Sequence, residues 1–122
     1  MSRQTLLWLF FGFSGRIDRQ AFALAGILLY LVRLYPVYRM IAADDQATID
    51  HWAQIFVVLF GILMISHLAI TAKRFHDIGR SGWYAILFLI GDIIVFLLLC
   101  MPQGTPGPNR YGKRANSGGP GD

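Results

Sequence analysis

The chain has 122 residues, of which 55% are hydrophobic and only 15% are charged, and its formal net charge is +4. A soluble domain carries about 25% charged residues, so this composition disfavours a water-soluble protein and favours lipid as the solvent. The single cysteine excludes an intrachain disulfide and a cysteine-based metal cluster. The basic residues lie at the ends of apolar segments rather than on a soluble module, so we expect membrane lipid, and no nucleic acid, as a partner.

The N-terminal apolar run covers residues 6–13, which is too short to cross a bilayer that needs roughly 20 helical residues. We expect an interfacial helix here, with Trp8 at the depth of the lipid headgroups. A cleaved signal peptide is the alternative. It is disfavoured because only Arg3 precedes the run, whereas Arg16 and Arg19 follow it directly.

Three later segments are candidate transmembrane helices, over about residues 19–43, 52–72 and 83–101. In the first, Pro36 and Arg39 interrupt the apolar pattern, so we expect residues 19–35 to cross and the remainder to lie at the interface. The second contains no formal charge, and the third contains one, Asp92. The sequence therefore predicts an all-α integral membrane protein of three spans, with residues 1–112 forming a single membrane domain.

The distribution of lysine and arginine predicts the orientation. Residues 1–20 carry three such cations and residues 73–82 carry three more, whereas residues 43–51 carry none and hold three aspartates. Cytoplasmic connections are enriched in lysine and arginine, so the N-terminus and the second connection are expected in the cytoplasm.

The C-terminal segment conflicts with that orientation, because three spans would export Arg110, Lys113 and Arg114. A re-entrant hairpin that turns at Gly91 and Asp92 is the alternative to a third span, and it would return these cations to the cytoplasm. The segment after residue 101 is rich in glycine and proline, which disfavours a packed core. We expect residues 113–122 to form a flexible, disordered tail.

Three motifs in the chain resemble those of a known family. They are F-S-G-R-I-D-R-Q-A-F at residues 13–22, K-R-F-H-D-I-G-R-S-G-W at residues 73–83 and G-P-N-R-Y-G at residues 107–112. In this order they resemble the bacterial "domain of unknown function 805" family, which pairs F-x-G-R-x-x-R with R-x-H-D-x-x-x-S-G-W and N-R-Y-G. The resemblance implies a multi-pass protein of the bacterial inner membrane, and it brings no established activity.

The central motif permits two interpretations. The first is a capped turn between two helices, in which Lys73 and Asp77 pair at i,i+4 and Ser81 caps the next helix. The second is a site for an anionic lipid headgroup, because arginine forks suit phosphate. The candidate contacts for such an anion are five side chains, Arg16, Arg19, Arg74, His76 and Arg80.

His76 and Asp77 also suggest a catalytic pair, but adjacent helical residues point about 100° apart, so a direct dyad is not expected. Asp77 is instead expected to pair with Arg16, Arg19 or Arg74. No serine or cysteine nucleophile signature accompanies these residues, since capping accounts for Ser81, and the three histidines lack the spacing of a metal site. We therefore expect no enzyme activity, cofactor or metal.

Two ionisable residues, His67 and Asp92, lie inside predicted spans, where such groups are costly and face protein or water. The first interpretation is an interhelical hydrogen bond, which makes both residues structural. The leading functional hypothesis is a non-enzymatic accessory or scaffold protein, whose basic cytoplasmic surface contacts anionic lipid, a membrane-protein partner or another copy of the chain. The alternative is a small oligomeric transporter or channel in which His67 and Asp92 line the route.

Overall fold

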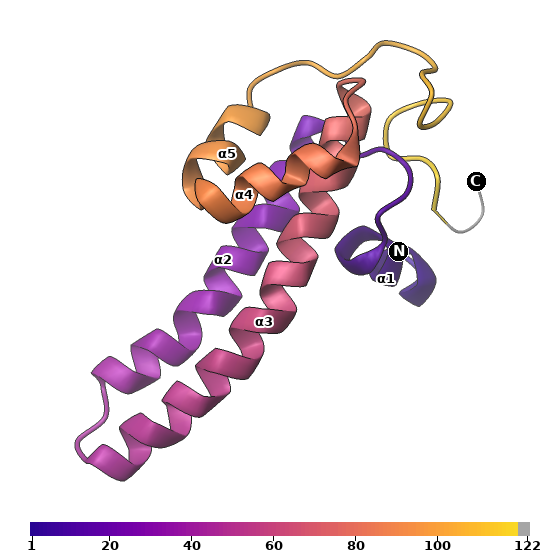
Figure 1. Cartoon of the computed structure of the whole chain (residues 1–122). Coiled ribbons are helices and arrows are strands. Elements are labelled where there is room, and N and C mark those ends of the chain that lie inside the picture. The colour runs from indigo at the N-terminus through magenta and orange to yellow at the C-terminus, as the bar shows by residue number, and fades with distance from the viewer. Residues whose placement is uncertain (120–122) are drawn as a thin grey trace.

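The structure is a computed structural model, and it describes residues 1–119. Its elements are α1 (Arg3–Phe11), α2 (Arg19–Ile41), α3 (Gln46–Asp77), the 3-10 helix η1 (Gly82–Ile86), α4 (Leu87–Ile90) and α5 (Asp92–Leu99). Across the described residues the fold is helical, with two isolated β-bridges and no strand. The long helices α2 and α3 form an antiparallel hairpin, and the other elements gather at the end of it where α3 finishes (Figure 1).

Side-chain caps fix where the first three helices begin. Ser2, Asp18 and Asp45 each accept a hydrogen bond from the backbone N–H three residues later, at 3.0, 2.8 and 3.1 Å. A short polar side chain at this position satisfies a backbone donor that has no partner within the helix. At Asp45 the hydrogen bonds from Thr48 also hold the pKa of the carboxyl below its usual range.

Two helices in the described part of the chain are long and apolar enough to cross a membrane, namely α2 and α3. The 32 residues of α3 extend about 48 Å at 1.5 Å per residue, which exceeds a hydrocarbon core of about 30 Å. Large apolar side chains such as Leu31, Val57 and Ile65 are exposed along both helices. The first two predicted spans thus coincide with these helices, and α2 continues without interruption through Pro36 to Ile41.

The segment predicted as a third span, residues 83–101, is not one continuous helix. It is divided into η1, α4 and α5, and the helix breaks at Gly91, whose φ of −137° and ψ of 62° are not helical. The chain leaves the C-terminal end of α3 and then returns to it. At the point of return, the carbonyl of Leu99 accepts a hydrogen bond from Arg74. A single spanning helix is therefore replaced by a segment that turns back, as in the re-entrant alternative.

The tail also differs from the expectation of a disordered segment over residues 113–122. The carbonyl of Ser117 accepts the backbone N–H of Arg16 at 2.9 Å, and Asn116 exchanges two hydrogen bonds of 3.0 Å with Asp18. Residues 113–119 are therefore attached to the segment before α2. The rest of the predicted tail, residues 120–122, lies outside the described residues.

The apolar core lies where α5 and η1 cover the hairpin, and it includes Phe22, Ile70, Phe88 and Phe96. A Cβ added at Gly26 would lie 2.1 Å from the ring of Phe96, so α2 and α5 approach closely only because residue 26 has no side chain. This packing places the start of α2, the end of α3 and the C-terminal segment together.

Candidate functional site

Asp77 is the centre of a buried charge cluster at the end of α3. Its Oδ1 lies 3.0 Å from Nε of Arg16, and its Oδ2 lies 2.8 Å from Nη1 of Arg74. All three side chains are almost completely buried. Charged groups removed from water are tolerated when they are paired and hydrogen-bonded, so this carboxylate and the two guanidinium groups depend on one another.

The remaining donors of Arg16 reach the C-terminal segment. Nη1 donates to the carbonyls of Gly107 and Gly112 at 2.8 and 3.1 Å, and Nη2 donates to the carbonyl of Thr105 at 2.7 Å. The backbone N–H of Thr105 in turn donates to the carbonyl of Asp77 at 2.7 Å. A chain segment without regular secondary structure is thus ordered because its carbonyls satisfy a buried cation.

Arg74 binds the segment on the other side of Asp77. Its Nε donates to the carbonyl of Leu99 at 2.9 Å, and its Nη2 donates to the carbonyl of Pro102. A Cβ at Gly104 would lie 1.9 Å from Oδ2 of Asp77, so the chain can pass this carboxylate only with glycine there. The three sequence motifs therefore meet in one hydrogen-bonded cluster.

Lys73 is fully buried one residue before Arg74 and attaches α1 to the rest of the protein. Its ammonium group donates to the backbone carbonyls of Trp8 and Leu9 at 2.6 and 2.7 Å, and also to that of Gly12. The last carbonyls of a helix lack partners within it, and they carry the negative end of the helix dipole. Lys73 is thus a cationic cap for α1, rather than the surface partner of Asp77 that the i,i+4 spacing suggested.

His76 points away from Asp77 and contacts both of the other motifs. Its Nδ1 lies 2.9 Å from the carbonyl of Gly15, and its ring stacks on Tyr111 with the centroids 4.1 Å apart. Asn109 donates from Nδ2 to the backbone carbonyl of His76 at 2.9 Å. The two adjacent residues, His76 and Asp77, have separate partners and do not form a dyad.

The five candidate anion contacts fall into two groups. Arg16 and Arg74 are buried and donate to acceptors of the protein itself, so neither guanidinium faces a lipid headgroup. Arg19 and Arg80 are exposed, although Arg19 also donates to the carbonyl of Met101 at 3.1 Å. His76 is half-buried. Of the five, the geometry leaves Arg19 and Arg80 as the cations that face outward.

His67 and Asp92 do not contact each other. Asp92 accepts hydrogen bonds from the hydroxyl of Tyr30 and from Nη1 of Arg33, the latter at 3.1 Å. His67 is fully buried between the rings of Tyr30 and Phe88, and neither of its ring nitrogens has a hydrogen-bond partner among the described residues. The predicted interhelical bond of His67 is therefore replaced by ring stacking, and Asp92 pairs with α2 instead.

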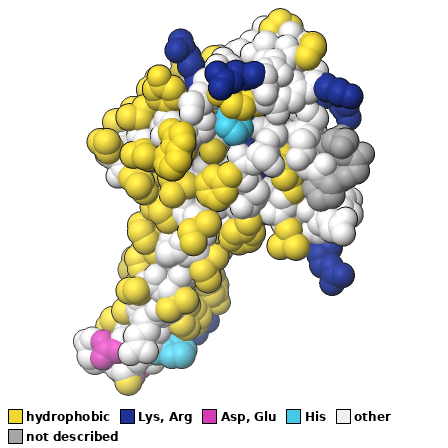
Figure 2. Space-filling view, turned by 45° about the vertical axis from the view of Figure 1, so that its right-hand side comes forward, with side chains coloured by type: hydrophobic (Ala, Val, Ile, Leu, Met, Phe, Trp, Pro, Cys, Tyr) yellow, Lys and Arg dark blue, Asp and Glu magenta, His cyan; other side chains and the backbone are white. Residues whose placement is uncertain are grey.

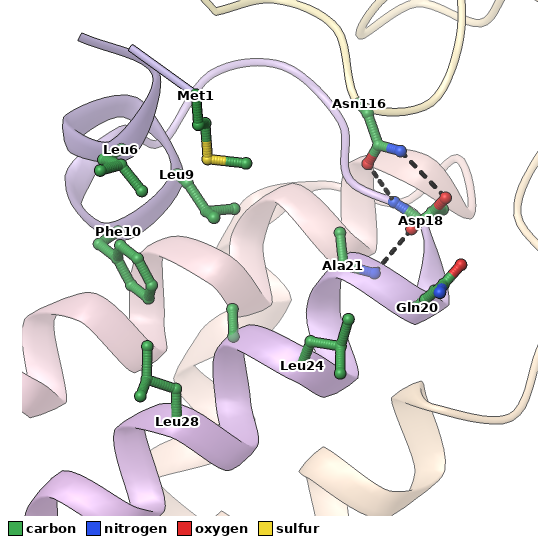
Figure 3. Close-up of a pocket in the computed structure, with 11 residues that line it drawn as sticks. Met1, Leu6, Leu9, Phe10, Asp18, Gln20, Ala21, Leu24, Leu28 and Asn116 are labelled. Atoms are coloured by element: carbon green, nitrogen blue, oxygen red, sulfur yellow. Dashed lines mark hydrogen bonds between the residues drawn. The ribbon is translucent and has the colours of Figure 1, made fainter. Parts of the chain in front are cut away.

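An apolar groove of 420 Å³ lies between α1 and the first turns of α2. Figure 3 shows Leu9, Phe10 and Leu28 on its walls, while Asp18 and Asn116 are hydrogen-bonded to each other at one end. In the described part of the chain, no three His, Cys, Asp or Glu side chains come together as metal ligands. The groove holds no cluster of titratable groups and suggests no chemistry of its own.

Sequence reasoning missed the roles of Lys73, Arg33 and Tyr111. The i,i+4 spacing predicts a surface pair between Lys73 and Asp77. The backbone carbonyls that Lys73 binds instead are distant in the sequence, and no local pattern indicates them. Arg33 and Tyr30 lie three residues apart on α2, and this spacing places both on one face of the helix. That spacing was the available signal for a partner of Asp92.

Comparison with known proteins agrees with the membrane fold. The chain is 42% identical over 62 residues to inner membrane protein YhaH of Escherichia coli K12, a match that covers 48% of this chain and 50% of YhaH. It is 31% identical over 104 residues to inner membrane protein YhaI of the same organism, which covers 83% of each chain. The match thus spans about half the length of YhaH and most of YhaI, and no solved structure matches significantly.

Residues 10–113 match the model of a family described as "protein of unknown function (DUF805)". That interval contains the three motifs and every residue of the Asp77 cluster. Together with the relatives and the two long apolar helices, this match places the protein in the bacterial inner membrane. The chain belongs to the DUF805 family of inner-membrane proteins of unknown function.

Proposed function

We propose that this protein is a non-enzymatic accessory or scaffold protein, which presents a rigid basic surface at the cytoplasmic face of the inner membrane. The observation that carries the proposal is the division of its charges into two sets. The buried ones, Arg16, Lys73, Arg74 and Asp77, are bound to one another or to backbone carbonyls. Groups held in this way order the surface.

The exposed cations at the same end form the proposed binding surface. Arg19, Arg80 and Arg110 are exposed there, and Figure 2 shows basic side chains around the broad end of the molecule, with acidic ones at the narrow end. Juxtamembrane cations attract anionic lipid by about 1 kcal/mol each. Anionic lipid, a partner protein with an acidic face or a second copy of this chain would complement this surface.

The proposal requires an N-in orientation, which labelling in intact cells can test. With Cys100→Ala as the background, we expect an external thiol reagent to label Asp45→Cys and not Ser81→Cys. Asp45 lies between α2 and α3 at the acidic end, and Ser81 lies in the loop at the basic end. Strong external labelling of position 81 would place the basic surface outside the cell and refute the proposal.

The proposed lipid contact predicts that cations at the two ends are not equivalent. We expect Arg19→Gln and Arg80→Gln each to reduce the retention of phosphatidylglycerol by about fivefold, as loss of about 1 kcal/mol implies. Arg39→Gln removes the same charge near the other end of α2 and is the matched control. Native mass spectrometry from lipid nanodiscs measures both lipid retention and copy number. The proposal would be contradicted if all three variants lost phosphatidylglycerol equally and the protein were found as a single copy without a bound partner.

A small oligomeric transporter or channel is the second candidate. It is favoured by His67, because both ring nitrogens of this buried side chain lack partners among the described residues. Asp92 lies near it through the shared neighbour Tyr30. Combining His67→Phe with Asp92→Asn separates the two candidates, since a conductor would lose ion flux in proteoliposomes whereas a scaffold would retain lipid binding and change mainly in stability.

A further inference from the structure

A second pocket, of 530 Å³, lies between α3, η1 and the C-terminal motif at residues 107–112. Its walls are apolar and include Leu68, Ala85 and Ile86. Its polar groups come from His76, Ser81 and Arg110. Arg110 is absent from the candidate anion contacts derived from the sequence. It lines this pocket because the C-terminal segment folds back onto α3.

The polar side of this pocket is built around the ring of Tyr111. His76 stacks on that ring, and the guanidinium carbon of Arg110 lies 5.1 Å from its centroid. Since Nδ1 of His76 is directed at the carbonyl of Gly15, it is the nitrogen that donates, and in the neutral ring Nε2 is an acceptor. A Cβ at Gly82 would lie 2.8 Å from Nε2, so η1 can begin this close to the imidazole only with glycine at this position.

The apolar side of the pocket borders the surface expected to face lipid. Trp83 is 81% exposed and Ile86 is 51% exposed, and both line the pocket. Tryptophan is enriched where the hydrocarbon meets the headgroups, because its ring is amphipathic. The pocket therefore has a cationic end and an apolar end, and its opening lies at the expected depth of the lipid headgroups.

We propose that this pocket binds one anionic phospholipid molecule. The guanidinium of Arg110 holds the headgroup phosphate, and an acyl chain lies along Leu68 and Ile86. A free phosphate would use the cation and leave the apolar walls unfilled, whereas a neutral lipid would leave Arg110 without a counter-charge. This inference rests on the proposed function, because it requires the basic end to lie at the membrane, and it adds a defined site to that general surface.

Two variants with the same loss of charge test the headgroup contact. In nanodiscs of phosphatidylglycerol and phosphatidylcholine, we expect Arg110→Gln to reduce retention of a single phosphatidylglycerol about tenfold, since it removes a charge-assisted hydrogen bond. Lys113→Gln is the matched control, because Lys113 is exposed nearby but does not line the pocket. It should change that retention much less. Thermal denaturation of both variants should confirm that the fold is retained, as expected for exposed side chains.

A second pair of variants tests the acyl-chain contact. Ile86→Asn places an amide on the pocket wall and should weaken phosphatidylglycerol retention, whereas Ile90→Asn changes a more exposed residue of α4 outside the pocket and should not. Equal losses in Arg110→Gln and Lys113→Gln would overturn the pocket and leave the general basic surface standing. A wild-type protein with no preference for phosphatidylglycerol over phosphatidylcholine would refute both.

Discussion

Replacing Asp77 with asparagine is expected to lower the free energy of unfolding by about 3–5 kcal/mol, because it leaves two buried guanidinium groups without their counter-charge. Arg16 and Arg74 both pair with this carboxylate, and neither side chain reaches solvent. Their other donors hold the carbonyls of the C-terminal segment, so the loss should also loosen that segment. Thermal and chemical denaturation in detergent micelles measures the stability change.

Asp44→Asn is the control for this variant, since Asp44 is exposed at the opposite end of the hairpin. It should change stability by less than about 0.5 kcal/mol. Adding Arg16→Gln to Asp77→Asn should cost less than the sum of the two single changes, because the two residues are in contact. Additive effects, or equal stability of the two aspartate variants, would show that the cluster does not hold the motifs together.

The meeting of the first two motifs, at residues 13–22 and 73–83, followed from the sequence by topology. If two apolar segments form a hairpin, the start of the first and the end of the second lie at the same depth. Arg16 precedes α2 and Asp77 ends α3, so their proximity needed only the two spans and the sign of the charges. These spans were predictable because each combines length, low charge and polar ends, which are local properties of the chain.

The third apolar segment shows where that reasoning fails. Residues 83–101 have the composition of a spanning helix, yet a helical hairpin of the same residues would have the same composition. What decides between them is the break at Gly91 and the capture of the Leu99 carbonyl by Arg74, which is distant in sequence. Hydropathy contains no information on such a contact.

The ordering of the segment after residue 101 could not be predicted for a related reason. Its glycine and proline content indicates that it cannot build an apolar core, and this argument holds. The segment is instead ordered through its backbone, because the carbonyls of Thr105, Gly107 and Gly112 satisfy Arg16. Glycine at residues 104 and 112 permits the close approach, so the composition that suggested disorder is also what the packing requires.

Lys73→Met is expected to release α1 from α3. Methionine preserves the unbranched, apolar part of the side chain but removes the ammonium donor of three backbone carbonyls. A hydrogen bond to a charged group contributes about 1.5–3 kcal/mol, and water can replace part of the loss once α1 separates, so we expect a net loss of about 3 kcal/mol. The main readout is hydrogen exchange of the α1 amides, which should become much faster while those of α2 and α3 change little.

Lys113→Met makes the same chemical change at an exposed position and should leave exchange in α1 unaltered. Lys73→Arg should release α1 only in part, because a planar guanidinium keeps the charge but cannot direct three donors to carbonyls arranged around one nitrogen. If α1 remained as protected in Lys73→Met as in the wild type, its attachment would depend on the packing of Trp8, Leu9 and Phe10 against the core, and the cationic cap would be dispensable.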